Sequence, residues 1–178
     1  MIIFMGVAGS GKSSQGRMLA DELGLPWLST GEFLRMLISG QRRKDMQDGH
    51  LLDDKEIISL VRKIFGVVDT NHEFVLDGFP RTAAQADWLL SQIKHGQLHM
   101  TAIIHLTATR DKVKERLLSR GRPDDHEEAI EKRFKEYEEE ILSILDDFRK
   151  ANVPVYDING EARVADVHEE IMKVLGDK

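Results

Sequence analysis

The chain has 178 residues, enough for one domain with a sizeable core and too few for two independent catalytic domains. Its net charge of −6 excludes the basic excess that general binding to nucleic acid or to an anionic membrane requires. The absence of cysteine excludes disulfides, thiolate metal sites and cysteine nucleophiles. No apolar run approaches the ~18 residues of a membrane span, and the first residues lack a signal peptide's basic segment. We therefore expect a cytoplasmic protein.

Short apolar runs alternate along the chain with longer segments of helical period, a pattern typical of parallel strands joined by helices. The first, third and fourth runs are almost continuously apolar, which indicates strands covered by helices on both faces. The prediction is an α/β fold with three α/β/α layers and its sites at the carboxyl ends of five parallel strands. The predicted strands are residues 2–6, 26–29, 73–77, 101–106 and 153–158.

Two stretches interrupt this alternation. About 43 residues separate the second and third predicted strands, more than one crossover helix needs, which indicates a helical insertion. Within it we predict helices over 31–39, 44–49 and 53–65. Farther along, the turn 121–125 separates helices predicted at 110–119 and 126–150, because Pro123 cannot continue a helix.

Three capping boxes predict where helices begin. Ser29, Asp53 and Asp125 each place a side-chain acceptor three residues before a glutamate.

The segment Gly-Val-Ala-Gly-Ser-Gly-Lys-Ser at 6–13 follows the first predicted strand and opens a helix predicted from Lys12. Glycines there allow backbone N–H groups to converge on phosphate oxygens, and the helix N-terminus adds partial positive charge. Lys12 can reach the β and γ phosphates, while Ser13 or Ser14 can offer a hydroxyl towards Mg²⁺. The motif predicts binding of a nucleoside triphosphate. It leaves the fate of the γ-phosphate open, because hydrolases, switches and kinases share it.

A second motif, Asp77-Gly78-Phe79-Pro80-Arg81, ends the third predicted strand. An aspartate at this edge can hold Mg²⁺ through water, because Mg²⁺ retains much of its hydration shell. The turn would aim Arg81 across the sheet edge, where its planar fork suits a second phosphate.

Arginines form a third signal in this acidic chain. Arg116 and Arg120 share one helical face, Arg122 lies in the turn, and Arg133 lies about three helical turns along the next helix. A helical hairpin hinged at Gly121 would bring these side chains to one side. Two phosphate-bearing substrates brought into line for transfer would need such a cluster.

Seven segments together resemble the adenylate kinase (nucleoside monophosphate kinase) family, in family order and nearly end to end: GVAGSGKSSQ, STGEFLR, DGHLL, LDGFPRTAAQ, ERLLSRGRPDD, EEAIEKRF and VYDING. The resemblance implies a P-loop NTPase-type core, an insertion that binds a nucleoside monophosphate (NMP), a lid, and transfer from Mg-ATP to the NMP. On this basis the single domain divides into a core at 1–29, 67–119 and 127–178, an insertion at 30–66 and a truncated lid at 120–126.

The resemblance also implies the roles of individual residues. Gln85 would read the acceptor base, and a glutamine there favours AMP. The implied catalytic group is Lys12, Arg81, Arg120, Arg122 and Arg133, and Ser13 with Asp77 would hold Mg²⁺. The implied ATP site is Gly9, Ser10, Gly11, Lys12, Ser13, Ser14, Arg116, Arg120 and Ala162. The implied NMP site is Thr30, Arg35, His50, Leu51, Leu52, Gly78, Phe79, Pro80, Arg81, Gln85, Arg122 and Arg133.

Two other functions fit part of the sequence. A P-loop kinase for a small metabolite such as gluconate would share the first motif but has no need of Arg35, Arg81 and Gln85 for a second phosphate. A non-catalytic nucleotide-binding protein would fit the short lid. The seven histidines form no metal-binding pattern. We expect a monomer whose partners are small-molecule nucleotides, with no nucleic acid or membrane partner.

Overall fold

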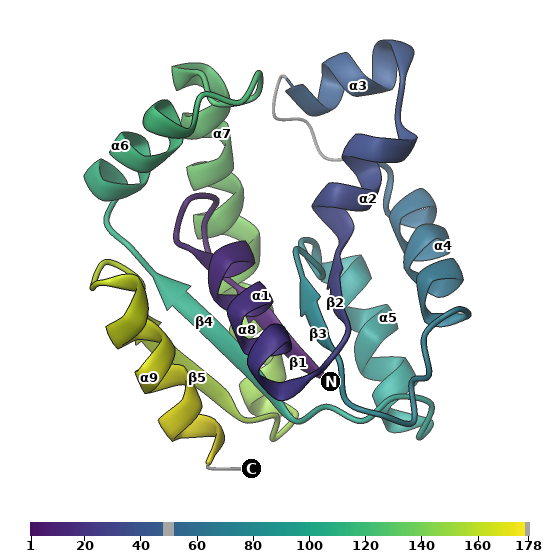
Figure 1. Cartoon of the computed structure of the whole chain (residues 1–178). Coiled ribbons are helices and arrows are strands. Elements are labelled where there is room, and N and C mark those ends of the chain that lie inside the picture. Colours follow the sequence, from purple (N-terminus) through teal and green to yellow (C-terminus); the bar gives the residue numbers. More distant parts are fainter. Residues whose placement is uncertain (48–51, 177–178) are drawn as a thin grey trace.

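A computed structural model describes residues 1–47 and 52–176. Its centre is one sheet of five parallel strands in the order β2-β3-β1-β4-β5, which confirms the predicted fold class (Figure 1). All five predicted strands are present within two residues of their expected bounds. They are β1 (Ile2–Met5), β2 (Trp27–Ser29), β3 (Val75–Asp77), β4 (Ala102–Thr107) and β5 (Val155–Asn159).

Helices connect these strands and form the outer layers. The helices between β1 and β4 are α1 (Lys12–Leu23), α2 (Thr30–Leu37), α3 (Gly40–Gln47), α4 (Asp54–Phe65) and α5 (Ala83–Lys94). After β4 come α6 (Arg110–Arg120), α7 (Glu127–Glu136), the π-helix η1 (Tyr137–Ile141), α8 (Leu142–Lys150) and α9 (Val164–Leu175). Within residues 1–47 and 52–176, none of the helices combines the length and apolarity needed to cross a bilayer.

The sheet buries both faces, as the continuous apolar runs predict. Side chains alternate along β1, so Ile2 and Phe4 join the cluster beneath α1 and α9, whereas Ile3 and Met5 join the cluster beneath α4, α5 and α8. Figure 1 shows α1 and α9 in front of the sheet and α5 and α8 behind it. The helices α2, α3, α6 and α7 rise beyond the carboxyl ends of the strands, where they can enclose a site (Figure 1).

Two of the three predicted helix caps are confirmed. Ser29 Oγ accepts from the backbone N–H of Glu32 at 3.4 Å, and the Asp53 carboxylate accepts from that of Lys55 at 2.9 Å. The prediction for Asp125 is wrong. His126 caps α7, and the Asp125 carboxylate instead binds Arg120 in the preceding turn.

The segment predicted as one helix over 126–150 is divided. The π-helix η1 separates α7 from α8, and its first residue is Tyr137. In the insertion, three helices are present as predicted, although the middle one begins at Gly40 rather than residue 44. The end predicted for it, 48–49, lies outside the described residues.

Candidate active site

The loop after β1 is shaped to leave backbone N–H groups exposed to an anion. Gly6 has φ +136°, and a Cβ there would lie 2.3 Å from the Leu106 carbonyl oxygen, so a side chain cannot be accommodated. Gly11, at φ +106°, precedes α1. Among the described residues, no side chain caps α1 and none in its first turn is acidic. The positive end of α1 is therefore available to phosphate.

Lys12 folds back across this loop. Its Nζ donates to the Val7 carbonyl oxygen at 2.7 Å, which holds the ammonium over the phosphate-sized concavity. Desolvation lowers the pKa of Lys12 to about 8, a shift that Asp77 opposes and that the charges of Arg81, Arg120 and Arg133 reinforce. The low pKa reflects burial first and, after it, the arginine charges that lie near the ammonium.

Asp77 stands at the carboxyl end of β3, beside the strand that carries the loop. Its carboxylate is buried, and Oδ2 accepts from Ser13 Oγ at 2.5 Å and from Ser29 Oγ at 3.3 Å. A carboxylate and a hydroxyl oxygen thus meet at the floor of the loop. Hard oxygen donors of this kind are those that Mg²⁺ prefers, so the residues present fit that ion.

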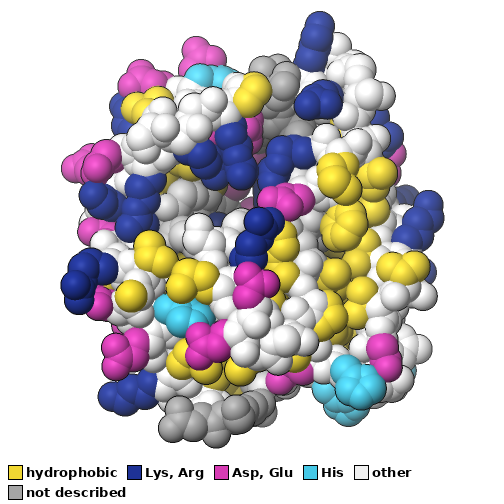
Figure 2. Space-filling model, in the orientation of Figure 1, with side chains coloured by type: hydrophobic (Ala, Val, Ile, Leu, Met, Phe, Trp, Pro, Cys, Tyr) yellow, Lys and Arg dark blue, Asp and Glu magenta, His cyan; other side chains and the backbone are white. Residues whose placement is uncertain are grey.

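A cavity of about 420 Å³ opens above these groups. Figure 2 shows lysine and arginine side chains gathered around a hollow on this face of the molecule. The structure places all the predicted ATP-site residues on the wall of this cavity: Gly9, Ser10, Gly11, Lys12, Ser13, Ser14, Arg116, Arg120 and Ala162.

Most of the predicted NMP-site residues line the same cavity. They are Thr30, Arg35, Leu52, Gly78, Arg81, Gln85, Arg122 and Arg133. Phe79 and Pro80 lie instead on a neighbouring cavity of about 70 Å³, and Phe79 is buried with its ring 5.8 Å from that of Trp88. His50 and Leu51 lie outside the described residues.

The turn after β3 is closely packed against α2. Gly78 has φ +83°, and a Cβ there would lie 2.9 Å from Thr30 Oγ1, which itself donates to the Gly78 carbonyl at 2.8 Å. Arg81 Nε donates to the same carbonyl at 2.9 Å. This arrangement anchors the start of the insertion to the turn that carries Arg81.

Both ends of the Gln85 side-chain amide are hydrogen-bonded within the protein. Its side-chain carbonyl accepts from the Arg81 backbone N–H at 2.9 Å, and its amide donates to Asp54 Oδ1 at 2.8 Å. The side chain is almost fully buried. In this arrangement Gln85 joins the first turn of α4 to the Arg81 turn while lining the cavity.

Arg120, at the end of α6, and Arg133, in α7, are held by two aspartates that the sequence analysis did not include in the site. Arg120 Nε and Nη2 donate to the fully buried Asp125 carboxylate at 2.7 and 2.6 Å. Arg133 pairs with Asp124 and reaches Asp125 at 3.4 Å. The position of both aspartates directly after Arg122-Pro123 is the signal that could have identified them.

Two further arginines, Arg35 and Arg116, line the cavity. Arg116 Nη1 donates to the Gly160 carbonyl at 2.8 Å, next to the loop that carries Ala162. Arg35 and Arg122 line the same cavity, which brings the insertion and the turn 121–125 to one site. Desolvation and the nearby charge of Arg122 lower the pKa of Arg35. Further lining residues absent from the prediction include Leu34, Ile57 and Glu136.

A parallel sheet, a phosphate-binding loop at the end of its central strand and a second group of cations across one cavity define a P-loop nucleotide-binding protein. The sequence matches the adenylate kinase family over residues 4–153. It is 34% identical to an adenylate kinase of Corynebacterium urealyticum over 180 residues, and 32% identical to adenylate kinases of Leptospira biflexa and Nostoc sp. over 184 and 181 residues. Each match covers 98% of both chains. The chain belongs to the adenylate kinase family.

The lengths of these relatives bear on the short turn at residues 121–125. Because 180 aligned positions cover 98% of the Corynebacterium protein, that protein is close in length to this chain. A turn as short as 121–125 is therefore compatible with the overall length of relatives that carry the adenylate kinase name.

Proposed function

We propose that this protein transfers the γ-phosphoryl group of ATP to AMP, giving two molecules of ADP. The observation that carries this proposal is that one cavity is lined both by residues 8–13 of the loop, Lys12 among them, and by Arg81, Arg122 and Arg133. A triphosphate and a monophosphate can meet there with their phosphates between two positive walls. The gluconate-like alternative has no use for the second wall.

In the proposed reaction an oxygen of the AMP phosphate attacks the γ-phosphorus of ATP in line with the leaving oxygen. The bond between the γ-phosphorus and the β,γ-bridging oxygen breaks as the new bond forms, and ADP leaves with the electron pair. The attacking oxygen is already anionic, so no side chain is needed as a strong base. Catalysis then depends on positioning and on stabilising the transferred group's charge.

The protein residues divide these tasks. Backbone N–H groups of the loop and Lys12 would bind the β and γ phosphates of ATP. Arg81 would bind the AMP phosphate, and Arg120, Arg122 and Arg133 would neutralise charge between the two nucleotides. Bound Mg²⁺ would shield the ATP phosphates, with Ser13 and Asp77 as the residues that hold it.

The division of the chain follows from the same proposal. The insertion 30–66 would bind AMP, and the turn 120–126 would cover the phosphates as a truncated lid. Arg116 and Ala162 would contact the ATP adenine, while Gln85 would face the adenine of AMP. Gln85 lines the cavity beside Arg81, and this position supports a role in the acceptor site.

A coupled assay tests the proposal. Purified protein is mixed with Mg-ATP and, separately, with AMP, CMP, UMP or gluconate, and ADP formation is measured. We expect turnover with AMP and much less with the other acceptors. Turnover with gluconate alone would favour a small-metabolite kinase, and nucleotide binding without turnover would favour a non-catalytic protein. Titration with a dinucleotide polyphosphate that spans both sites would show whether two nucleotides fit at once.

We also propose that the protein acts as a monomer in the cytoplasm. One chain supplies both positive walls of the cavity, and the lack of cysteine suits a reducing compartment. Light scattering of the purified protein at several concentrations tests the monomer.

A further inference from the structure

We propose that His105 is a positioning residue for phosphoryl transfer, which holds Tyr137, and through it the end of α7 that carries Arg133, against the strand next to the phosphate-binding loop. This inference rests on the proposed function. Within residues 1–47 and 52–176, His105 lines neither cavity and its side chain makes no hydrogen bond to a predicted site residue, so its effect would pass through Tyr137.

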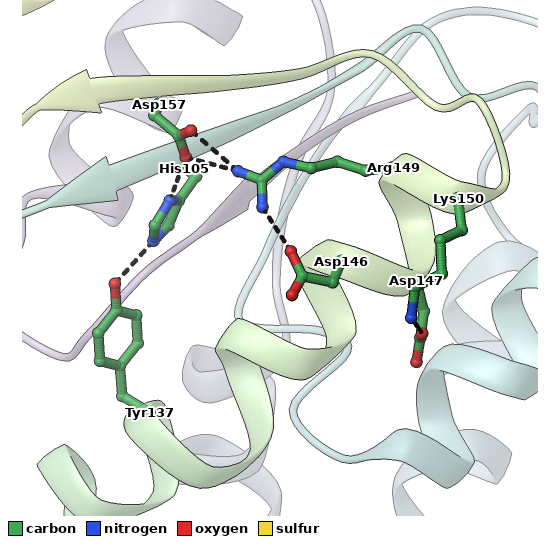
Figure 3. Close-up of polar contacts among 7 residues, drawn as sticks. All are labelled: His105, Tyr137, Asp146, Asp147, Arg149, Lys150 and Asp157. Atoms are coloured by element: carbon green, nitrogen blue, oxygen red, sulfur yellow. Dashed lines mark hydrogen bonds and ion pairs between the residues drawn. The ribbon is translucent and has the colours of Figure 1, made fainter.

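The contacts form a chain across three elements (Figure 3). The imidazole of His105, on β4, is buried. Its Nδ1 lies 2.6 Å from Asp157 Oδ1 on β5, and its Nε2 lies 2.8 Å from the Tyr137 hydroxyl. The His105 and Tyr137 rings are also stacked, with centroids 5.9 Å apart. Both ring nitrogens are therefore committed to specific partners.

The direction of the hydrogen bonds follows from chemistry. Burial lowers the pKa of His105 despite the opposing effect of Asp157, so the ring is neutral near pH 7. The Asp157 carboxylate can only accept, and Nδ1 must therefore carry the proton. Nε2 is then an acceptor, to which the Tyr137 hydroxyl donates. This bond fixes Tyr137 to β4.

Tyr137 stands where its position affects the site. It is the first residue of η1, one helical turn after Arg133, and it lines the 70 Å³ cavity together with Lys12, Arg133 and Glu136. It also packs against the cluster that contains Val7 of the phosphate-binding loop. On the other side, His105 pairs with Met5, the residue directly before that loop. The bond from Tyr137 to His105 thus connects the end of α7, which carries Arg133, to the strand beside β1, which leads into the phosphate-binding loop.

The hydrogen bond between His105 and Tyr137 also lies at the start of the π-helix η1. A π-turn inserts an extra residue into a helix, and such turns are frequent at functional sites. The π-helix begins at Tyr137, directly after the last residue of α7. The bond from Tyr137 to His105 therefore fixes the end of α7 to the sheet. A displacement of that end would rotate Arg133 relative to Lys12, and misplacements of about 1 Å can reduce turnover by up to two orders of magnitude.

The rest of the network does not need His105. Arg149 Nη2 donates to both carboxylate oxygens of Asp157, at 3.0 and 2.9 Å, and these side chains are 40% and 54% exposed. Asp157 therefore keeps a charged partner and solvent when the imidazole is removed. The bond whose loss would matter is the one to Tyr137.

Two substitutions of His105 separate the contribution of its Nδ1 contact from that of its Nε2 contact. In His105→Asn the terminal atoms of the side chain fall near the position of Nδ1, so the Asp157 contact can remain while the Tyr137 contact is lost. In His105→Gln they fall near Nε2, so the side-chain carbonyl can still accept from Tyr137. Tyr137→Phe removes the same bond from the other side and leaves His105 in place.

The experiment measures kcat and KM for ATP and AMP in these variants and in the wild type, well below their melting temperatures. We expect His105→Asn and Tyr137→Phe to lower kcat about tenfold, with KM for ATP changed less than twofold. The double variant should lose no more than either single one, and His105→Gln should retain at least half of the wild-type kcat.

The outcomes separate the two proposals. A wild-type protein without ATP and AMP turnover would overturn the proposed function, and this inference with it. An active wild type with unchanged kcat in Tyr137→Phe and His105→Asn would overturn this inference alone. Equal losses of kcat in His105→Asn and His105→Gln, in proportion to their loss of melting temperature, would show a purely structural role and would also overturn it.

Discussion

The two walls of the cavity are built in different ways. The donor wall is mainly backbone, formed by consecutive residues 6–13 and fixed by glycines such as Gly6, where no side chain fits. The opposite wall consists of guanidinium groups from the turn after β3, the end of α6, the turn 121–125 and α7. Two of them, Arg120 and Arg133, are held by Asp124 and Asp125. The donor wall is formed before any ligand arrives, whereas phosphate on the other wall must compete with carboxylates.

Lys12→Met is expected to have the largest effect, because it removes the one side-chain cation of the donor wall. We expect kcat/KM for ATP to fall about 10³-fold, the order seen when a preorganised group that stabilises transition-state charge is removed. The melting temperature should not fall, since the desolvated ammonium lies among three arginine charges. The coupled assay and a thermal melt measure both.

Lys112→Met is the matched control for this prediction, because Lys112 pairs with Glu115 at the surface. It should leave turnover unchanged. If Lys12→Met retained more than a tenth of the wild-type activity, the donor wall would depend on backbone alone.

Arg122→Ala tests the opposite wall. In the described part of the chain, the Arg122 guanidinium makes no hydrogen bond or ion pair, although its backbone N–H donates to Asp125 at 3.1 Å. We therefore expect turnover to fall about 10²-fold with almost no loss of stability. Arg120→Ala, which removes a partner of the buried Asp125, should reduce both. Equal melting temperatures for the two variants would contradict this assignment of roles.

The pH dependence of ATP use distinguishes the walls in the wild-type protein. The pKa of Lys12 is about 8, whereas arginine keeps its charge. The protonated ammonium binds phosphate, so kcat/KM for ATP should be nearly level below about pH 7, fall to about half at pH 8 and be about tenfold lower at pH 9. Bound phosphates raise the pKa of Lys12, so kcat should fall at a higher pH. A profile of kcat/KM that stays level to pH 9.5 would refute this prediction.

The same contrast explains what the sequence could predict. The donor wall is local: a strand, a glycine loop and a helix start lie within 6–13, and the pattern itself predicts the geometry. The strands and the extra helices of the insertion were also predictable, because apolar periodicity and segment length indicate them.

The arrangement of the arginine wall depends on which partners its side chains bind, and local sequence spacing does not determine these partners. Asp125 has the spacing of a helix cap, but Arg120 and Arg133 offer its carboxylate stronger, charge-assisted bonds, and His126 becomes the cap. The family resemblance predicts that Gln85 belongs to the acceptor site, but the sequence does not reveal its bonds to Arg81 and Asp54. The π-helix at Tyr137 was also missed, since it shares the residue types of an ordinary helix.

Asp125→Asn gives the smallest expected effect and tests what holds the arginine wall. Burial alone would raise the pKa of Asp125, but hydrogen bonds from Arg120 and its charge outweigh burial and lower it. A carboxylate with a lowered pKa stabilises the fold above its unfolded pKa, near 4, and that stability is lost as the pH falls through the folded value. The neutral amide of asparagine should therefore have the same effect on stability as protonation of the Asp125 carboxylate at low pH.

We expect Asp125→Asn to lower the free energy of unfolding at pH 7 by about 2 kcal/mol, and the melting temperature by roughly 4 to 8 °C. Hydrogen exchange should increase in 120–126 and remain unchanged in 6–13, because the donor wall does not depend on this carboxylate. Asp166→Asn is the control. Its pair with Arg163 has side chains 44% and 86% exposed, so its loss should cost less than about 1 kcal/mol. Equal destabilisation by both variants would mean that burial of Asp125 contributes nothing, and faster exchange in 6–13 would mean that the two walls are not independent.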